Sequence, residues 1–119
     1  MIVGNGIDLI ELERIENLIL HKGKFAKRVL SPKEYGRFEQ YSNLKRRIEF
    51  LAGRFAAKEA YSKAIGTGIG KHISFHSIEI FTDNFGKPQL YINGEAQQKT
   101  HVSISHSRDY AIAQVIIEK

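Results

Sequence analysis

The chain has 119 residues, a formal net charge of +5, no cysteine and a 42% share of hydrophobic residues. This length suits one domain with one core, the apolar share argues against global disorder, and the lack of cysteine excludes disulfides and thiolate metal sites. No apolar run approaches the ~20 residues of a membrane span, and the first residues do not resemble a signal peptide. We expect one cytoplasmic domain over residues 1–119.

A strand interrupted by glycine is predicted over residues 2–10. Gly4, Gly6 and Asp8 alternate along it and so share one face. Glycine inside a strand often marks close approach by another backbone or by a ligand. An acid in such an apolar strand is costly to bury unless something satisfies its charge. Asp8 is therefore either a metal ligand or the cap of the next helix, whose first turn is acidic.

An amphipathic helix is predicted over residues 11–21, with Gly23 beyond its end as a C′ glycine. Arg14 lies off the apolar stripe of this helix and should be exposed. The next segment, residues 22–29, mixes four basic residues with Phe25 and Val29. It is either a solvated loop or a landing surface for an acidic partner.

Two further helices follow. Ser31, Pro32 and Glu34 form a capping box with proline at the first helical position, which predicts a helix that ends near Tyr41. A long helix is predicted over residues 43–65. One stripe of apolar side chains should bury it, formed by Leu44, Ile48, Leu51 and Phe55.

Glu59 and Lys63 stack on one side of the long helix, at the border of its apolar stripe. They form either an ordinary surface pair, worth a few tenths of a kcal/mol, or part of a site, because Ala52, Ala56 and Ala60 leave room beside them. At the start of the same helix, the basic run of residues 45–47 opposes the macrodipole, which mildly favours a ligand role.

The long helix ends in the glycine-rich segment 66–70, which is either an anion-binding nest or a plain C-cap and loop. A period of two then predicts strands at Ile73 and Phe75 and at residues 78–81, 90–92, 101–107 and 110–117. Turns are expected at residues 84–87, 93–94 and 107–109, and a short helical turn at residues 95–99. His106 alternates with Val102 and Ile104, a placement typical of a core histidine.

Charge and chemistry give the first functional hypothesis. Residues 14–63 hold 13 of the 18 Lys and Arg but 5 of the 13 acids, a balance of +8, which implies an anionic partner. Asp8, Glu59 and Lys63, together with His106, would supply what phosphoryl transfer needs. Two carboxylates can hold Mg²⁺, and a lysine can neutralise a phosphate. Spacing alone does not show that these groups meet.

Four stretches of the sequence resemble the holo-acyl-carrier-protein synthases, the short-chain members of the 4′-phosphopantetheinyl transferase superfamily. They are GIDLIE (6–11), RFAAKEAYSKA (54–64), the GTGIG that follows it, and SISHS (103–107). The resemblance implies an α+β fold with a long helix packed on a small antiparallel sheet. It also implies Mg²⁺-dependent transfer of 4′-phosphopantetheine from coenzyme A to a serine of apo acyl carrier protein, with release of adenosine 3′,5′-bisphosphate, in fatty acid biosynthesis.

The resemblance also assigns residues and partners. It implies Asp8 and Glu59 as Mg²⁺ ligands, and Glu59, Lys63 and His106 as catalytic residues. Either Glu59 or a metal-bound water would accept the serine proton. A homotrimer with active sites between subunits is expected, since an uncovered sheet face would need a partner. The resemblance places Lys63 and His106 near the coenzyme A phosphates, and we add Gly66, Thr67 and Gly68 beside them. From the basic surface alone, we expect Arg14, supported by Lys24 and Arg28, to meet the carrier protein, and Lys45, Arg46 and Arg54 to be weaker candidates for coenzyme A.

Two alternatives come from other classes of protein. A small basic nucleic-acid-binding module would explain the charge equally well. It would not explain two carboxylates at apolar-flanked positions, and the sequence has no aromatic platform of the RNP type. A protein that binds carrier protein without catalysis is the other alternative, and an intact set of Asp8, Glu59 and Lys63 argues against it. We therefore expect neither a nucleic-acid nor a membrane partner.

Overall fold

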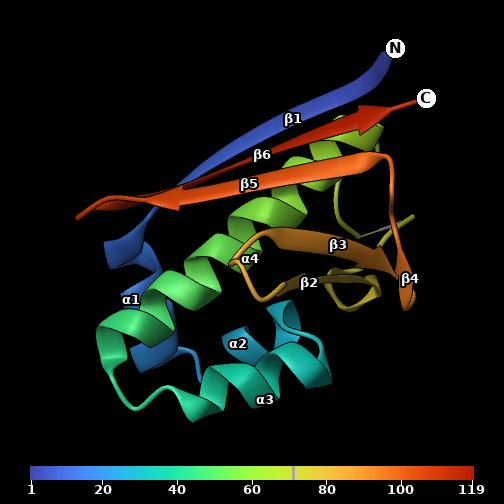
Figure 1. The fold of residues 1–119 in the computed structure, drawn as a ribbon. Helices are drawn as coiled ribbons and strands as arrows, with labels where there is room; N and C mark the ends of the chain where they lie inside the picture. The colour runs from blue at the N-terminus through green and yellow to red at the C-terminus, as the bar shows by residue number, and fades with distance from the viewer. Residues whose placement is uncertain (71) are drawn as a thin grey trace.

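Helix α4 runs through the middle of the molecule, between a sheet and a layer of shorter helices (Figure 1). The computed structural model describes residues 1–70 and 72–119. The predicted α+β fold, a long helix against antiparallel strands, is confirmed. The elements in chain order are β1 (Ile2–Glu11), α1 (Leu12–His21), α2 (Phe25–Val29), α3 (Pro32–Gln40), α4 (Leu44–Ile65), the 3₁₀ turn η1 (Phe75–Ser77), β2 (Ile78–Thr82), β3 (Pro88–Ile92), β4 (Glu95–Ala96), β5 (Thr100–His106) and β6 (Tyr110–Glu118).

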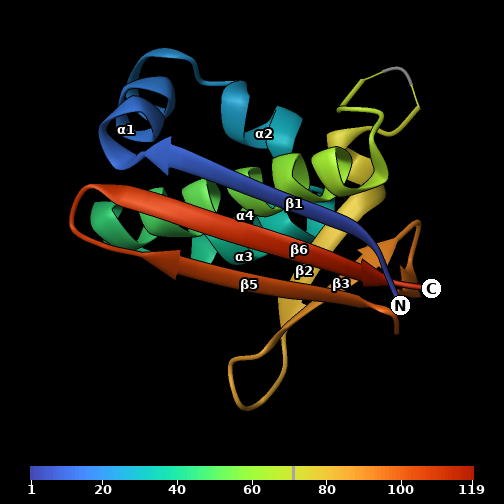
Figure 2. The same ribbon diagram turned by 90° about the horizontal axis from the view of Figure 1, so that it is seen from above.

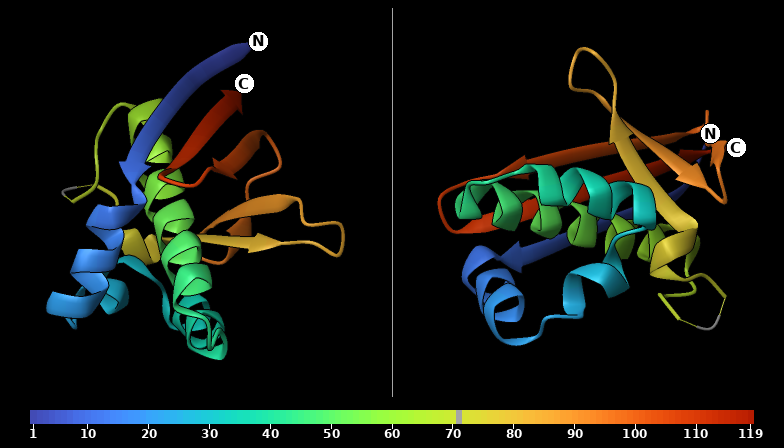
Figure 3. Two further views of the ribbon diagram at one scale, coloured as in Figure 1. Left: turned by 90° about the vertical axis from the view of Figure 1, so that its left-hand side faces the viewer. Right: turned by 90° about the horizontal axis from the view of Figure 1, so that it is seen from below.

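The strands form two antiparallel sheets. The first has the order β1-β6-β5 and lies along α4 (Figure 2). The second has the order β2-β3-β4, and its β2–β3 hairpin projects from the body of the molecule (Figure 3). Helices α2 and α3 cover the side of α4 opposite the first sheet. Helix α4 therefore packs against the first sheet and the three other helices, and its Arg54 side chain donates to the Ile80 carbonyl oxygen of β2 in the second sheet.

Small residues let β1 lie directly on α4. A Cβ atom added to Gly6 would stand 1.9 Å from the carbonyl oxygen of Ala60, and one added to Gly4 would stand 2.5 Å from that of Ala64. Any side chain at Gly6 would therefore force the strand away from the helix. The close approach predicted for these glycines is made by the helix backbone. The room beside the helix alanines is filled by the strand.

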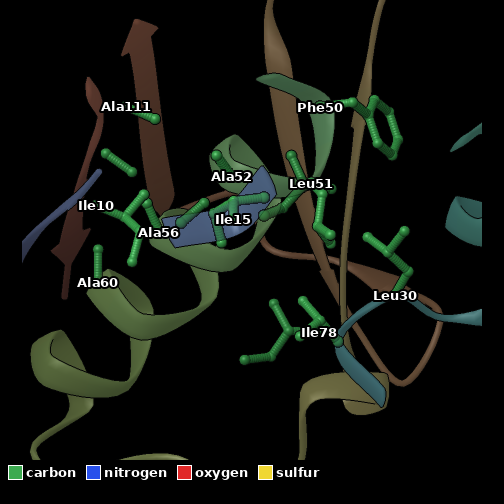
Figure 4. Packing of buried hydrophobic residues seen from close by; sticks show 14 of the residues in the cluster. Ile10, Ile15, Leu30, Phe50, Leu51, Ala52, Ala56, Ala60, Ile78 and Ala111 are labelled. Atoms are coloured by element: carbon green, nitrogen blue, oxygen red, sulfur yellow. The ribbon is translucent and has the colours of Figure 1, made fainter. Parts of the chain in front are cut away.

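The core surrounds α4 on most of its sides (Figure 4). Leu51 and Ala56 are completely buried, and Phe50 and Tyr61 are also buried, although neither belongs to the predicted stripe. Leu44, which does belong to it, remains 40% exposed. Ile48 and Leu51 of the predicted stripe are buried and Phe55 is partly buried, but the buried surface is wider than one stripe because the helix packs against a layer on each side.

The local signals for helix ends are confirmed. The Ser31 hydroxyl accepts from the Glu34 amide, and the Glu34 carboxylate accepts from the Ser31 amide, which completes the capping box of α3. The Asn43 side chain caps α4 by accepting from the Arg46 amide at 3.2 Å. Gly66 ends α4 in the left-handed region, with φ of 87°.

Two local predictions were wrong, those for residues 95–99 and for Phe75. Residues 95–99 are not a helical turn, because Asn93 and Gly94 both have positive φ and fold Glu95–Ala96 back onto β3 as strand β4. Phe75 lies in η1, which the Ser74 side chain caps. Helix α1 ends at His21 with Lys22 as its C-cap, so Gly23 stands at C′ as predicted, although its φ is not positive. In the described part of the chain, no helix is long and apolar enough to cross a membrane.

Candidate functional site

Asp8 and Lys63 meet where β1 crosses the end of α4. The Lys63 ammonium donates to Asp8 Oδ1 at 3.0 Å and to the carbonyl oxygen of Ile7 at 2.9 Å. The Asp8 side chain is 16% exposed and that of Lys63 is 53% exposed. The alternative that Asp8 caps the next helix was wrong, because the N-cap of α1 is Glu11, which makes no side-chain cap bond.

Glu59 lies one helical turn before Lys63 and is partly buried. Burial raises the pKa of the Glu59 carboxyl, the charge of Asp8 raises it further, and the charge of Lys63 lowers it. The two carboxylates therefore share one electrostatic environment, in which the single ammonium does not offset burial and repulsion. A second cation placed between them would relieve that cost.

The end of α4 uses its glycine amides within the chain. The Gly66 amide donates to the carbonyl oxygens of Ser62 and Lys63, and the Gly68 amide donates to that of Ser62. The Gly70 amide donates to the carbonyl oxygen of Ile73. The structure thus favours the C-cap over the anion nest for these three amides. Thr67 lies exposed beside them, and the resemblance still assigns this segment to coenzyme A.

His106 lies at the end of β5, away from the sheet core. Its side chain is 37% exposed, and Nδ1 stands 3.5 Å from Glu49 Oε2. It borders a cavity of about 150 Å³ whose wall also includes Arg46 and Arg54. His106 is therefore not a core histidine, because the strand carries it past Val102 and Ile104 to the rim of the packed region.

The basic candidates for coenzyme A differ in how they are held. Arg46 pairs with Glu49 at 3.2 Å, and its guanidinium lies over the Tyr41 ring. Arg54 stacks on the Phe50 ring at 4.1 Å, and burial lowers the pKa of its guanidinium. Lys45 is exposed and faces a separate groove on the α1 side of α4. Two of the three therefore border the His106 cavity.

Within one chain, the structure does not bring His106 to the two carboxylates. Its partner Glu49 precedes Glu59 by ten residues on α4, a separation of roughly 15 Å along the axis at 1.5 Å per residue. Asp8, Glu59 and Lys63 form one group, which we call the carboxylate group. Arg46, Arg54 and His106 form another, which we call the basic cavity.

A third surface lies on α1 and α2. Lys24, Arg28 and Phe25 line a concave region together with Leu18 and Lys22. Arg14 is exposed one helical turn before Leu18, so it extends the basic rim of this surface. The floor is partly apolar, because Phe25 packs on the buried side against Phe55, with ring centroids 5.9 Å apart. Such a surface suits an acidic helix with exposed apolar side chains.

The donor set of the carboxylate group suits a hard cation. In the residues that the structure describes, no cluster of three or more His, Asp or Glu could ligate a metal. Asp8 and Glu59 supply oxygen donors only, which favours Mg²⁺ over softer metals. With two protein ligands, the other positions of the ion would be left to water and phosphate oxygens, the usual arrangement for Mg²⁺.

Sequence reasoning missed several residues around these groups. Glu49 lies beside both His106 and Arg46, but nothing in its spacing distinguishes it from a solvated helix glutamate. Lys58 and Glu34 form a buried ion pair at 2.6 Å. Lys58 stands inside the RFAAKEAYSKA stretch. A lysine among alanines that are expected to be buried needs a partner for its charge, and this need was the available signal. Glu34 was explained fully by its capping box, which hid its second role.

Comparisons with known proteins point to one family over nearly the whole chain. The model of the 4′-phosphopantetheinyl transferase superfamily matches residues 4–115. A holo-[acyl-carrier-protein] synthase of Geobacillus sp. (strain WCH70) is 62% identical over 119 residues, covering 100% of this chain and 98% of that protein. The corresponding protein of Anoxybacillus flavithermus is 58% identical with the same coverage. A crystal structure of the Bacillus anthracis synthase in complex with CoA (3′,5′-ADP) has a TM-score of 0.90 and 50% identity, covering 100% of this chain and 98% of that one.

Proposed function

The chain belongs to the holo-[acyl-carrier-protein] synthase family of 4′-phosphopantetheinyl transferases, and from this we propose that it modifies apo acyl carrier protein with the 4′-phosphopantetheine group of coenzyme A. The proposed reaction depends on Mg²⁺, releases adenosine 3′,5′-bisphosphate and serves fatty acid biosynthesis in the cytoplasm. The observation that carries the proposal is the carboxylate group, in which Asp8, Glu59 and Lys63 converge from β1 and α4.

In the proposed mechanism, the carrier serine attacks the β-phosphate of coenzyme A. Its oxygen forms the new P–O bond as the bond to the adenosine bisphosphate breaks. Glu59 takes the serine proton, a role that its raised pKa favours. Lys63 is exposed enough to turn from Asp8 toward the pyrophosphate and offset its charge. Mg²⁺ held by Asp8 and Glu59 would supply Lewis-acid stabilisation of the leaving group.

Coenzyme A is proposed to reach from the carboxylate group to a basic cavity. Lys63 and the segment 66–68 stand at the pyrophosphate end. Arg46 and Arg54 offer cations to the remaining phosphate and His106 offers a ring N–H donor, with Lys45 as a weaker candidate. Because roughly 15 Å of helix separates the two groups in one chain, the cavity of a neighbouring subunit is the proposed partner of each carboxylate group.

A homotrimer is proposed to supply that neighbour. The face of the first sheet that turns away from α4 exposes apolar side chains from two strands, namely Ile7, Leu9, Tyr110 and Ile112. Such an apolar patch favours an interface between subunits. Light scattering should give about three times the chain mass of 13.5 kDa. Mixing and refolding the inactive variants Glu59→Gln and His106→Ala together should restore activity, since some sites would receive one intact half from each subunit. A fully active monomer would overturn the shared site.

Acyl carrier protein is proposed to dock on α1 and α2 through Arg14, Lys24 and Arg28.

The activity itself is tested by incubating the chain with coenzyme A, Mg²⁺ and apo carrier protein. Mass spectrometry should show the carrier gaining one phosphopantetheine and adenosine 3′,5′-bisphosphate appearing in equal amount. Carrier binding without a mass change would indicate a binding protein, and salt-dependent binding of nucleic acid without transfer would indicate the nucleic-acid module.

A further inference from the structure

Lys58 and Glu34 form an ion pair in the middle of the protein. Lys58 Nζ donates to Glu34 Oε1 at 2.6 Å, and both side chains are fully buried. The same ammonium donates to the carbonyl oxygens of Val29 at 2.7 Å and of Phe75 at 2.9 Å. One side chain of α4 therefore holds the end of α2, the start of α3 and η1 together. Burying two charges is costly, so such a pair is weak evidence for stability alone.

Glu34 continues this connection to the second sheet. Its Oε2 atom accepts from the backbone amide of Ile80 at 2.9 Å. Strand β2 is an edge strand that pairs only with β3 in its sheet. On its free edge, the Glu34 carboxylate accepts the hydrogen bond that a neighbouring strand would otherwise accept. The carbonyl oxygen of Ile80 in turn accepts from Arg54 Nη2 at 3.2 Å. One residue of β2 thus contacts Glu34 through its amide and Arg54 through its carbonyl group.

Arg54 has few other contacts that fix its direction. Its guanidinium stacks on Phe50, which leaves it free to rotate in the ring plane. In the part of the chain that the structure describes, its buried Nε atom has no hydrogen-bond partner. The Ile80 carbonyl is therefore the polar contact that orients the guanidinium, and a shift of β2 would turn it.

We infer that Lys58 and Glu34 are positioning residues, which hold β2 against α4 and thereby aim Arg54 at a phosphate of coenzyme A. This inference rests on the proposed function, because it takes Arg54 as a coenzyme A contact. Arg54 and Lys58 lie one turn apart on α4, and Glu59 follows Lys58 directly. The same buried pair therefore fixes the helix that carries Glu59 and the strand that orients Arg54.

The test compares Glu34→Gln with Ser31→Ala. Glu34→Gln keeps the size of the side chain but removes the charge that holds Lys58. Ser31→Ala removes the cap hydroxyl of α3 and its 2.6 Å bond to Glu79, while the Lys58–Glu34 contact stays. Coenzyme A binding is measured by calorimetry in Mg²⁺, at a temperature where circular dichroism shows both variants folded, and KM for carrier protein is measured alongside.

Glu34→Gln should bind coenzyme A about tenfold more weakly, the scale of one well-aimed charge-assisted hydrogen bond. Ser31→Ala should bind it as the wild type does, and KM for carrier protein should stay the same in both. Equal weakening in both variants, or none in Glu34→Gln, overturns the positioning role. If Glu34→Gln does not fold, Glu34→Asp takes its place, because it keeps the charge but is too short to reach both Lys58 and Ile80. A wild-type chain that does not bind coenzyme A would instead overturn the proposed function.

Discussion

Two of the lysines on helix α4, Lys58 and Lys63, stand five residues apart and form opposite kinds of ion pair. Lys58 and Glu34 are fully buried, and every proton of the ammonium has an acceptor. Lys63 and Asp8 meet at the surface, where the lysine side chain is 53% exposed. The buried pair can only be broken at the cost of stranding a charge in the core. The exposed pair can be exchanged for a ligand at little cost. The same helix therefore carries Lys58, whose charge is fixed in the core, and Lys63, whose charge can turn to a ligand.

The largest effect is expected from breaking the buried pair. Lys58→Met should lower the free energy of unfolding by about 3–5 kcal/mol, because it leaves the Glu34 carboxylate buried without its cation. Lys63→Met is the matched control on the same helix, and its loss should stay below about 1 kcal/mol. Urea denaturation followed by circular dichroism measures both. Equal losses in the two variants would contradict the distinction between the pairs.

How far the sequence predicts this distinction depends on the range of the interactions. The capping box of Ser31 and the Asn43 cap are local, and so is the turn at residues 93–94, and all of them follow from the sequence. The Lys58–Glu34 contact joins residues 24 apart, and no spacing rule brings them together. The packing of β1 on α4, which places Asp8 beside Lys63, is also long-range. The residue types suggested that these groups belong together, but their spacing did not show that they meet.

The errors have the same origin. Phe75 was predicted in a strand because its neighbours alternate, but Ser74 caps a 3₁₀ turn whose backbone carbonyl accepts from Lys58. The stripe on α4 was predicted too narrow because the sequence does not reveal that the helix has a layer on each side. The surroundings of His106 depend on how far β5 runs past the core. Tertiary contacts decided each of these cases against the local pattern.

The next largest effect is expected at the two acids of the carboxylate group, Glu59 and Asp8. Glu59→Gln keeps the shape of the side chain and loses its charge, so kcat should fall at least ~10²-fold, the scale of one electrostatic or general-base element. Asp8→Asn should behave similarly, with partial rescue by excess Mg²⁺ or Mn²⁺. Steady-state kinetics with coenzyme A and carrier protein measures both. Near-normal turnover of both variants in limiting Mg²⁺ would overturn the metal site and leave Asp8 and Lys63 as an ordinary ion pair.

Replacing Lys63, the exchangeable lysine, should change the transfer rate and the Mn²⁺ affinity in opposite directions. Lys63→Met should lower the transfer rate, because it removes the cation proposed for the pyrophosphate. It should also tighten Mn²⁺ binding in the absence of coenzyme A, by roughly fivefold, since one exposed charge contact with Asp8 no longer competes with the metal. Electron paramagnetic resonance of free Mn²⁺ measures the affinity. Weaker Mn²⁺ binding in this variant would show that Lys63 and the metal do not compete for Asp8.

Protons should compete with the metal at Glu59. Burial and the charge of Asp8 raise the pKa of Glu59 above its ordinary value of 4.5. A protonated carboxyl does not ligate a metal, so Mn²⁺ affinity should rise with pH through this raised pKa and level off above it. Asp8→Asn removes one cause of the raised pKa of Glu59. The remaining Mn²⁺ affinity of this variant should therefore level off at a lower pH than the affinity of the wild type does. A profile that does not move would contradict the coupling between the two carboxylates.

The smallest effect is expected from an exposed charge outside both pairs. Arg14 lies on the rim of the α1–α2 surface, where it is proposed to meet an acidic helix of the carrier protein. Exposed charges act mainly on encounter and are screened by salt. Arg14→Glu should therefore raise KM for carrier protein several-fold at low salt, about the effect of one reversed rim contact, and leave KM for coenzyme A nearly unchanged. The difference from the wild type should shrink in high salt. Lys119→Glu is the matched charge reversal at the far end of the chain, and it should change neither constant. Equal changes in both KM values for Arg14→Glu would contradict its assignment to the carrier surface, because a residue that contacts the carrier protein alone should change only the KM for carrier protein.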